Sequence, residues 1–222
     1  MLRFGPQSRE VVLAAMPPFE EANRLRAFLV TLLRALGDHG IGAALPDMPG
    51  QGESLLGTED AALDDWRNAF AAAEEKLTRE GARVHIAAMR GGTLYDGRAN
   101  CQSRWHFAPV TGAALVRDMV RARQAAAKES GEAFDAGAIT GDGPPVELAG
   151  NRISRAMLAD LQGAVPYAGP ALRTLRLDTD AQPADRKIVA RPLWRRAEPD
   201  NNPAMARELA ADLADWVKQC AS

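Results

Sequence analysis

The stretch Arg83-Val-His-Ile-Ala-Ala-Met-Arg90-Gly-Gly-Thr93 decides the fold of this chain. Residues 84–88 form a short apolar run that is typical of a buried strand. The run leads into Arg90 with two glycines behind it. Ala88 and Gly92 lie two residues before and two residues after Arg90, where a larger side chain would collide in a tight bend. The pattern predicts a buried strand, a sharp turn with Arg90 at its apex, and a helix.

A turn of this kind is a nucleophile elbow, which in many hydrolases holds a serine at its apex. The apex here is Arg90, whose guanidinium stays protonated and cannot act as a nucleophile. The histidine base is also missing, because it belongs in the loop after the last strand and Trp194 stands there. Of the three histidines, His85 and His106 are expected to be interior side chains with hydrogen-bond partners. The sequence therefore predicts a hydrolase scaffold without a recognisable Ser-His-Asp triad.

The composition indicates one globular domain. The chain has 222 residues, 46% of them hydrophobic, and a net charge of -2 with both signs interspersed. No basic region indicates nucleic-acid binding, and no apolar run approaches the roughly 20 residues of a membrane span. We expect a cytoplasmic protein with no transmembrane segment. Cys101 and Cys220 are far apart and show no metal-ligand spacing, so we expect free thiols and neither a metal nor another cofactor.

Strand and helix patterns alternate along the chain. Short apolar runs predict strands at residues 11–16, 41–45, 84–88, 104–109, 171–177 and 187–193. Apolar residues at three- and four-residue spacing predict helices at 25–36, 60–80, 93–99 and 113–129, a short helix from about 154, and a closing helix at 205–217. This alternation predicts an α/β fold with a mostly parallel, doubly wound sheet over residues 1–222.

Polar residues refine this outline. Asn23 is the expected N-cap of the helix at 25–36, after a loop at 17–24. Glu74 is expected on the solvated side of the helix at 60–80, and so are the arginines of the helix at 113–129, because acidic residues interrupt them. Residues 111–170 form a long excursion between two strands, where we expect a small helical cap or lid. Ligands of such sheets bind beyond the carboxyl ends of the strands.

Several loop motifs resemble those of one protein family. They are Pro17-Pro18-Phe19-Glu20-Glu21-Ala22-Asn23, Leu45-Pro46-Asp47-Met48-Pro49-Gly50-Gln51-Gly52-Glu53-Ser54, Met89-Arg90-Gly91-Gly92, Trp105-His106-Phe107-Ala108-Pro109-Val110, Glu147-Leu148-Ala149-Gly150-Asn151-Arg152-Ile153-Ser154 and Pro192-Leu193-Trp194. Together they resemble the second type of exosortase A system-associated hydrolase over most of the chain. The resemblance implies an alpha/beta-hydrolase fold and a bacterial setting of exopolysaccharide production and surface-protein sorting. It also implies that arginine is usual at the elbow. The chain departs from the family by having one residue fewer between Phe19 and the glutamates and by Ala88 in place of glycine.

The candidate site gathers around Arg90. A desolvated guanidinium needs a carboxylate partner, so we expect Glu20 or Glu21 to pair with Arg90. One interpretation is a structural ion pair. The other is that Arg90 holds the carboxylate or phosphate of a ligand, between Trp105 and Trp194 as aromatic walls. The remaining predicted ligand-binding residues are Phe19, Asn23, Met89 and Gly91.

Three functions remain open from the sequence. The first, which we favour, is a catalytically silent hydrolase fold that binds a small acidic or ester-like ligand. The second is a hydrolase of ester or acyl bonds in which Glu20 or Glu21 activates water while Arg90 stabilises the developing charge. The third is an interaction module that docks through its cap to a protein of the exosortase or exopolysaccharide system.

Overall fold

The computed structural model describes residues 1–52, 54–196 and 198–221. Within these residues seven strands form one sheet in the order β1-β3-β2-β4-β5-β8-β9. The strands are β1 (Leu2–Phe4), β2 (Glu10–Ala15), β3 (Gly42–Leu45), β4 (Arg83–Met89), β5 (Ser103–Phe107), β8 (Leu172–Leu177) and β9 (Arg186–Ile188). Neighbouring strands are parallel except β1, an edge strand that runs antiparallel to β3. The predicted mostly parallel α/β sheet is confirmed, whereas β1 was not expected.

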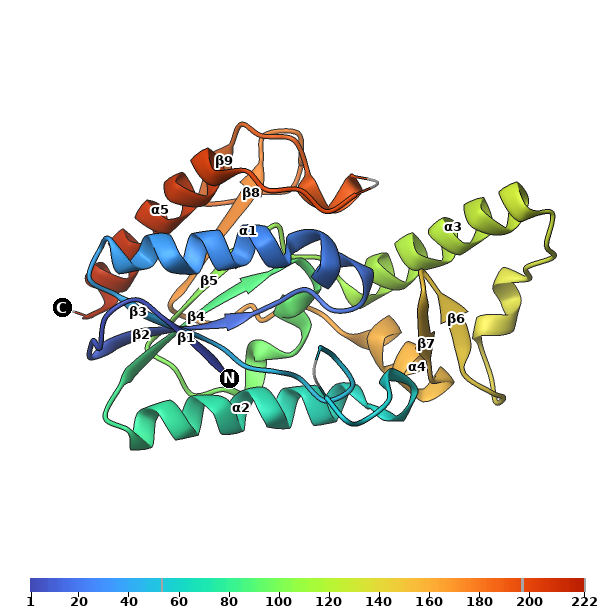
Figure 1. Ribbon diagram of the computed structural model, residues 1–222, viewed down its shortest axis with the longest axis horizontal. Helices are drawn as coiled ribbons and strands as arrows, with labels where there is room; N and C mark the ends of the chain where they lie inside the picture. The colour runs from blue at the N-terminus through green and yellow to red at the C-terminus, as the bar shows by residue number, and fades with distance from the viewer. Residues whose placement is uncertain (53, 197, 222) are drawn as a thin grey trace.

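Helices cover both faces of the sheet (Figure 1). α1 (Glu20–Gly37) and α5 (Pro203–Ala221) pack on one face, and α2 (Leu63–Arg79) packs on the other after a 3-10 turn, η1 (Thr58–Asp60). Alternate residues of β2 serve the two layers: Val12 and Ala14 face α1 and α5, and Leu13 faces α2. The continuous apolar run of this strand follows from burial on both faces. No helix in the described part of the chain is long and apolar enough to cross a bilayer.

The start of α1 differs from the expectation. The helix begins at Glu20 with Phe19 at its N-cap, so Asn23 lies within the helix and the loop at 17–24 ends early. No side chain caps this end. Glu20 and Glu21 instead occupy the first turn, where the positive end of the helix dipole stabilises carboxylates. These charges compensate for the missing cap. Because α1 begins at Glu20, both glutamates lie at the carboxyl edge of the sheet.

Three further expectations are corrected by the structure. Two 3-10 turns, η2 (Arg90–Leu94) and η3 (Asp96–Arg98), replace the helix predicted at 93–99, because the guanidinium of Arg104 binds the carbonyls of Asp96, Gly97 and Ala99. The last strand ends at Ile188, and a 3-10 turn, η5 (Leu193–Arg195), follows Pro192, which has no amide to give to a sheet. Glu74 is buried, not solvated, and accepts hydrogen bonds from Thr78 and the amide of Asn100.

The segment between β5 and β8 extends beyond the carboxyl ends of the strands (Figure 1). It contains α3 (Gly112–Ser130), the 3-10 turn η4 (Ala136–Ile139), the unexpected antiparallel hairpin of β6 (Val146–Leu148) and β7 (Asn151–Ile153), and α4 (Arg155–Gly163). Thr111 and Ser154 cap the two helices with their side chains. A Cβ at Gly112 would overlap the carbonyl of Leu161, so α3 and α4 pack in close contact.

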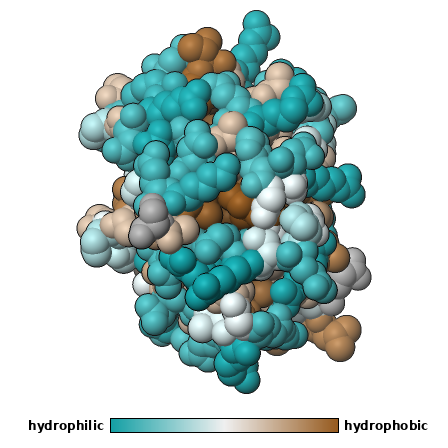
Figure 2. All heavy atoms as spheres, turned by 90° about the vertical axis from the view of Figure 1, so that its left-hand side faces the viewer, coloured by the Kyte–Doolittle hydropathy of each residue, from teal (hydrophilic) through white to brown (hydrophobic). Residues whose placement is uncertain are grey.

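The opposite end of the molecule faces the viewer in Figure 2. Hydrophilic residues cover most of this view, with apolar atoms near its centre (Figure 2). The elbow lies away from this face, at the carboxyl end of β4, where η2 contacts α3.

Candidate functional site

The turn after β4 has the tight geometry that the sequence predicts. Arg90 adopts φ 49, in the left-handed region that side chains other than glycine rarely occupy. A Cβ at Gly92 would overlap the carbonyl of Ala15, and a Cβ at Gly91 would lie 2.8 Å from Cδ of Pro18. The two glycines allow the turn to pack directly against the end of β2. The elbow backbone is therefore present, with an arginine at its apex.

The side chain of Arg90 is paired with Glu21. Its Nε and one terminal nitrogen donate to Oε1 of Glu21 at 3.0 and 2.8 Å, and the two side chains are only 11% and 13% exposed. The other carboxylate oxygen of Glu21 is buried and has no partner among the described residues. The guanidinium also lies over the ring of Trp194, 4.6 Å from its centroid. The expectation that one glutamate pairs with Arg90 is confirmed, and that glutamate is Glu21.

Glu20 has a different partner. It forms an ion pair with Arg24, one turn further along α1. Arg24 in turn donates to the carbonyl of Trp194 at 2.8 Å. Two sets of contacts thus join α1 to η5. One runs directly from Arg24 to Trp194, and the other runs from Glu21 through Arg90 to Trp194.

A cavity of about 690 Å³ lies in front of Arg90 and Trp194. Its walls come from the elbow, the start of α3, the loop between β8 and β9, and η5. The lining residues are Arg90, Ala108, Pro109, Val110, Thr111, Ala114, Arg117, Asp118, Arg121, Arg176, Leu177, Thr179, Asp180, Ala181, Gln182, Pro192, Trp194 and Arg195. Since these segments follow the carboxyl ends of their strands, the cavity is where a doubly wound sheet binds ligands.

The lining is rich in positive charge. It includes five arginines against the two carboxylates of Asp118 and Asp180. Arg176 pairs with Asp180 at 2.8 Å. Burial opposes ionisation of Asp180, but the amide of Gln182 and the guanidinium of Arg176 outweigh it and hold the pKa of this carboxyl below its ordinary value. Asp180 is therefore charged at neutral pH and neutralises Arg176.

Four of these arginines were not assigned to a site from the sequence. Arg117 and Arg121 are on the helix whose arginines were expected to face solvent only, and Arg176 and Arg195 lie near the ends of β8 and η5. A signal for the last two was present, since both positions fall beside strand ends where ligands bind. The two arginines on α3 could not be found this way, because the direction of α3 depends on its packing against α4.

The predicted ligand-binding residues are divided by the structure. Trp194 lines the cavity of Arg90, whereas Phe19 and Asn23 line a second cavity of about 320 Å³ together with Gln51 and Asn151. Glu53, which belongs to the loop motif at 45–54 in the sequence, lies outside the described residues. Gly91 is buried behind the elbow.

Two of the predicted residues belong to the core. Met89 and Trp105 are 0% exposed. Trp105 donates from Nε1 to Asp212 on α5 at 2.9 Å and stacks on Phe107. Neither residue is among those that line the two cavities, so the structure places both predicted ligand contacts in the core. The reason is that both lie inside strands whose two faces are covered by helices.

The interior histidines are both paired, as predicted. His85 lies 2.8 Å from Ser103 and 2.8 Å from Glu10. Burial, helped by Arg83 and opposed by Glu10, holds the pKa of His85 below its ordinary value. His106 lies 2.9 Å from the buried carboxylate of Asp96. His85 thus links β4 to β2 and β5, and His106 links β5 to η3.

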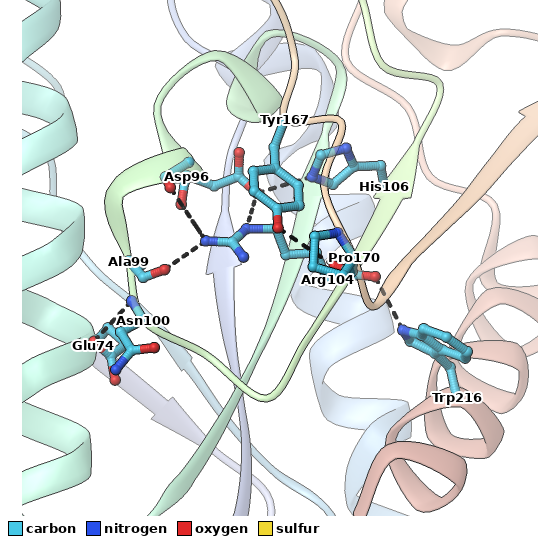
Figure 3. A network of polar contacts seen from close by, with 10 residues as sticks. Glu74, Asp96, Ala99, Asn100, Arg104, His106, Tyr167, Pro170 and Trp216 are labelled. Carbon is cyan, nitrogen blue, oxygen red and sulfur yellow. Dashed lines mark hydrogen bonds and ion pairs between the residues drawn. The ribbon is translucent and has the colours of Figure 1, made fainter.

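A buried polar network surrounds His106 (Figure 3). Asp96 lies between His106 and Arg104, whose Nε is 3.4 Å from the carboxylate. The ring of Tyr167 covers the guanidinium of Arg104, and the guanidinium carbon lies 4.1 Å from the ring centroid. The network connects the segment after the elbow to β5. Among the described residues, no group of three or more His, Cys, Asp or Glu side chains is arranged to hold a metal ion.

Comparisons with known proteins bear on the fold. No protein-family model and no curated protein matches the sequence. Solved structures do match. The esterase Est1E from Butyrivibrio proteoclasticus, solved with ferulic acid bound, gives a TM-score of 0.61 over 98% of this chain and 93% of its own, at 14% identity. This chain has the alpha/beta-hydrolase fold. At such low identity the likeness shows the fold alone.

Two further alpha/beta-hydrolases match over nearly their full length. A monoacylglycerol lipase from Paleococcus ferrophilus gives a TM-score of 0.55 at 14% identity and covers 99% of this chain and 98% of its own. A structure described under the metagenome-derived lipolytic enzymes LipS and LipT gives 0.55 at 14% identity, with 97% and 96% covered.

In this fold the nucleophile, the acid and the histidine follow one another along the chain. Here Arg90 follows β4, Asp180 follows β8 and Trp194 follows β9.

Proposed function

We propose that this protein binds a small anionic ligand in the cavity lined by Arg90 and Trp194, without serine hydrolysis. The observation that carries the proposal is the set of five arginines around one cavity at the elbow. Guanidinium groups recognise carboxylates and phosphates through paired hydrogen bonds. Arg90 donates from Nε and one terminal nitrogen to Glu21. Its other terminal nitrogen has no partner among the described residues. That nitrogen supplies a donor for a ligand oxygen.

The segment over residues 111–170 acts as a cap in this proposal. The first turns of α3 contribute Thr111, Ala114, Arg117 and Arg121 to the cavity wall. The resemblance to the second type of exosortase A system-associated hydrolase adds a bacterial setting of exopolysaccharide production and surface-protein sorting. An acidic metabolite of that setting, or another protein of that system, would then be the physiological partner.

A second candidate function is hydrolysis of ester or acyl bonds by a water that Glu21 activates. It is favoured by one observation: the second carboxylate oxygen of Glu21 is buried beside Arg90 without a partner among the described residues. A general base needs to reach the attacking water with a hydrogen bond, and Arg90 would stabilise the developing charge. Glu20 is less suited to this role because it is paired with Arg24.

The binding proposal is tested by isothermal titration with benzoate and with neutral benzyl alcohol. We expect saturable binding of benzoate and none of the alcohol. The variant Arg90→Gln/Glu21→Gln removes the ion pair without leaving an unpaired charge, and it should weaken benzoate about tenfold or more, the loss of one charge-assisted contact. The proposal would be refuted if the wild type bound benzoate and benzyl alcohol equally well. It would also be refuted if the wild type and the double variant bound benzoate equally well.

Hydrolysis is tested separately with p-nitrophenyl esters and a fluorophosphonate probe. Binding without serine chemistry predicts no labelling and no turnover by the wild type. Turnover that is lost in Glu21→Gln but kept in Ser54→Ala would replace the binding proposal with the water-activation mechanism. Labelling of the wild type would reveal a displaced nucleophile and contradict both.

A further inference from the structure

The charge balance of the cavity sets the charge of its ligand. Resting on the proposed function, we infer that the ligand is a dianion with an apolar, flat body, such as an organic phosphomonoester or an aromatic dicarboxylate. Two of the five arginines in the cavity wall have no carboxylate partner in the described part of the chain. Two unmatched positive charges attract a ligand that carries two negative ones.

Three of the arginines are matched by carboxylates. Arg90 is neutralised by Glu21 at 2.8 Å and Arg176 by Asp180 at 2.8 Å. Arg121 lies 4.0 Å from Asp118, one turn before it on α3. This last pair is exposed, with side chains 68% and 50% accessible, but its charges still cancel at the distance of a ligand. These three arginines contribute donors rather than net charge.

Arg117 and Arg195 are the unmatched pair. They come from different elements, α3 and η5, and both line the cavity. Neither has a carboxylate oxygen within 4.0 Å among residues 1–52, 54–196 and 198–221. Since the two side chains are exposed at the rim, they are solvated in the free protein and available to a ligand. The two guanidiniums therefore reach the cavity from different elements.

The cavity wall also offers an apolar surface. Ala108, Pro109, Val110, Leu177 and Pro192 line it beside Trp194. The ring of Trp194 already carries the guanidinium of Arg90 on one face. This surface suits a planar or apolar group, which would be removed from water while the charges of the ligand remain at the arginines.

The inference is tested with four probes at constant pH and ionic strength: benzoate, phthalate, phenyl phosphate and inorganic phosphate. At pH 7.5 benzoate carries one negative charge, and the other three are largely dianions. Phthalate and phenyl phosphate should bind about tenfold more tightly than benzoate, which corresponds to about 1.4 kcal/mol. Inorganic phosphate should bind more weakly than phenyl phosphate, because it lacks the apolar body.

Matched variants locate the effect. Arg117→Gln and Arg195→Gln should each weaken phthalate and phenyl phosphate much more than benzoate, and so remove most of the preference for dianions. Arg191→Gln is the control, since this exposed arginine is not among the lining residues and should change nothing. A comparison of phthalate with phenyl phosphate then separates carboxylate from phosphate recognition.

The outcomes are distinct for the two proposals. If benzoate and the dianions bind equally, the dianion inference is wrong while the proposed function stands. A preference for dianions that survives in both arginine variants also contradicts the inference. If none of the four probes binds, the proposed function itself fails.

Discussion

Arg90 donates two hydrogen bonds to a single oxygen of Glu21, at 3.0 and 2.8 Å, and so ties the elbow to the first turn of α1. The pair is largely removed from solvent. In a hydrolase of this fold a serine would stand at the same turn and face substrate. Here the apex residue is held in place by its neighbour, which makes the elbow a structural joint as well as a cavity wall.

Breaking this joint on one side should destabilise the protein more than removing it altogether. Arg90→Gln leaves a largely buried carboxylate unpaired, and Glu21→Gln leaves a largely buried guanidinium unpaired. We expect each to lower the free energy of unfolding by about 2 to 3 kcal/mol, somewhat less than for a fully buried pair. Urea denaturation would measure this. The double variant should lose less free energy of unfolding than either single variant, and simple additivity of the two losses would show that the pair is not coupled.

Asp212 should make the free energy of unfolding depend on pH in the acidic range. It binds Trp105 at 2.9 Å, Arg173 at 2.8 Å and Arg186 at 3.1 Å, and so anchors α5 to the sheet. Burial opposes its ionisation, but hydrogen bonds from Arg173, Trp105 and Arg186 outweigh it and lower the pKa of Asp212.

A folded-state pKa below the unfolded value contributes stability that is present above the unfolded value and lost as pH falls through the folded one. The wild type should therefore lose stability below about pH 4. In Asp212→Asn this part of the pH dependence should disappear, with a lower stability at pH 7. Chemical denaturation from pH 7 to pH 3 measures the stability at pH 7 and its loss in acid. If the variant loses as much stability in acid as the wild type, Asp212 does not have this role.

Gly92 should not tolerate a side chain. A methyl group there would overlap the carbonyl of Ala15, and backbone atoms cannot move aside as the end of a flexible side chain can. We expect Gly92→Ala to cost about 3 kcal/mol or more, as for severe overpacking. Gly97→Ala is the control, because a Cβ at Gly97 meets no atom within 4 Å. Equal unfolding midpoints for the two variants would contradict the close contact of the elbow with β2.

Cys101 should react slowly with alkylating reagents. Both cysteines are free, as the sequence predicted. Burial, with Asp96 and Glu74 adding to it and Arg104 opposing it, raises the pKa of Cys101 to about 11. Since the thiolate is the reactive form, iodoacetamide at pH 8 should modify Cys101 much more slowly in the native protein than in urea. Peptide mapping by mass spectrometry would follow this, and equal rates in both states would refute it.

The local sequence was sufficient for most of the secondary structure. The apolar run before Pro17 and the apolar spacing in α1, α2 and α5 predicted elements that the structure contains, because burial on a strand or helix face leaves a periodic trace. The elbow was predictable for a similar reason: Gly91 and Gly92 are required by close contacts, here with the ring of Pro18 and the backbone of Ala15. The errors fall where partners distant in sequence intervene, as at Arg104 and Glu74.

The sequence by itself thus determined the α/β fold, the elbow and the arginine at its apex. Only the tertiary structure decided which glutamate pairs with Arg90, that Trp105 is core while Trp194 lines a cavity, and that arginines of α3, β8 and η5 converge there. The physical reason is range. Hydrophobic periodicity and turn sterics act between neighbours in the chain, whereas the charge of a cavity is the sum over side chains that folding brings together.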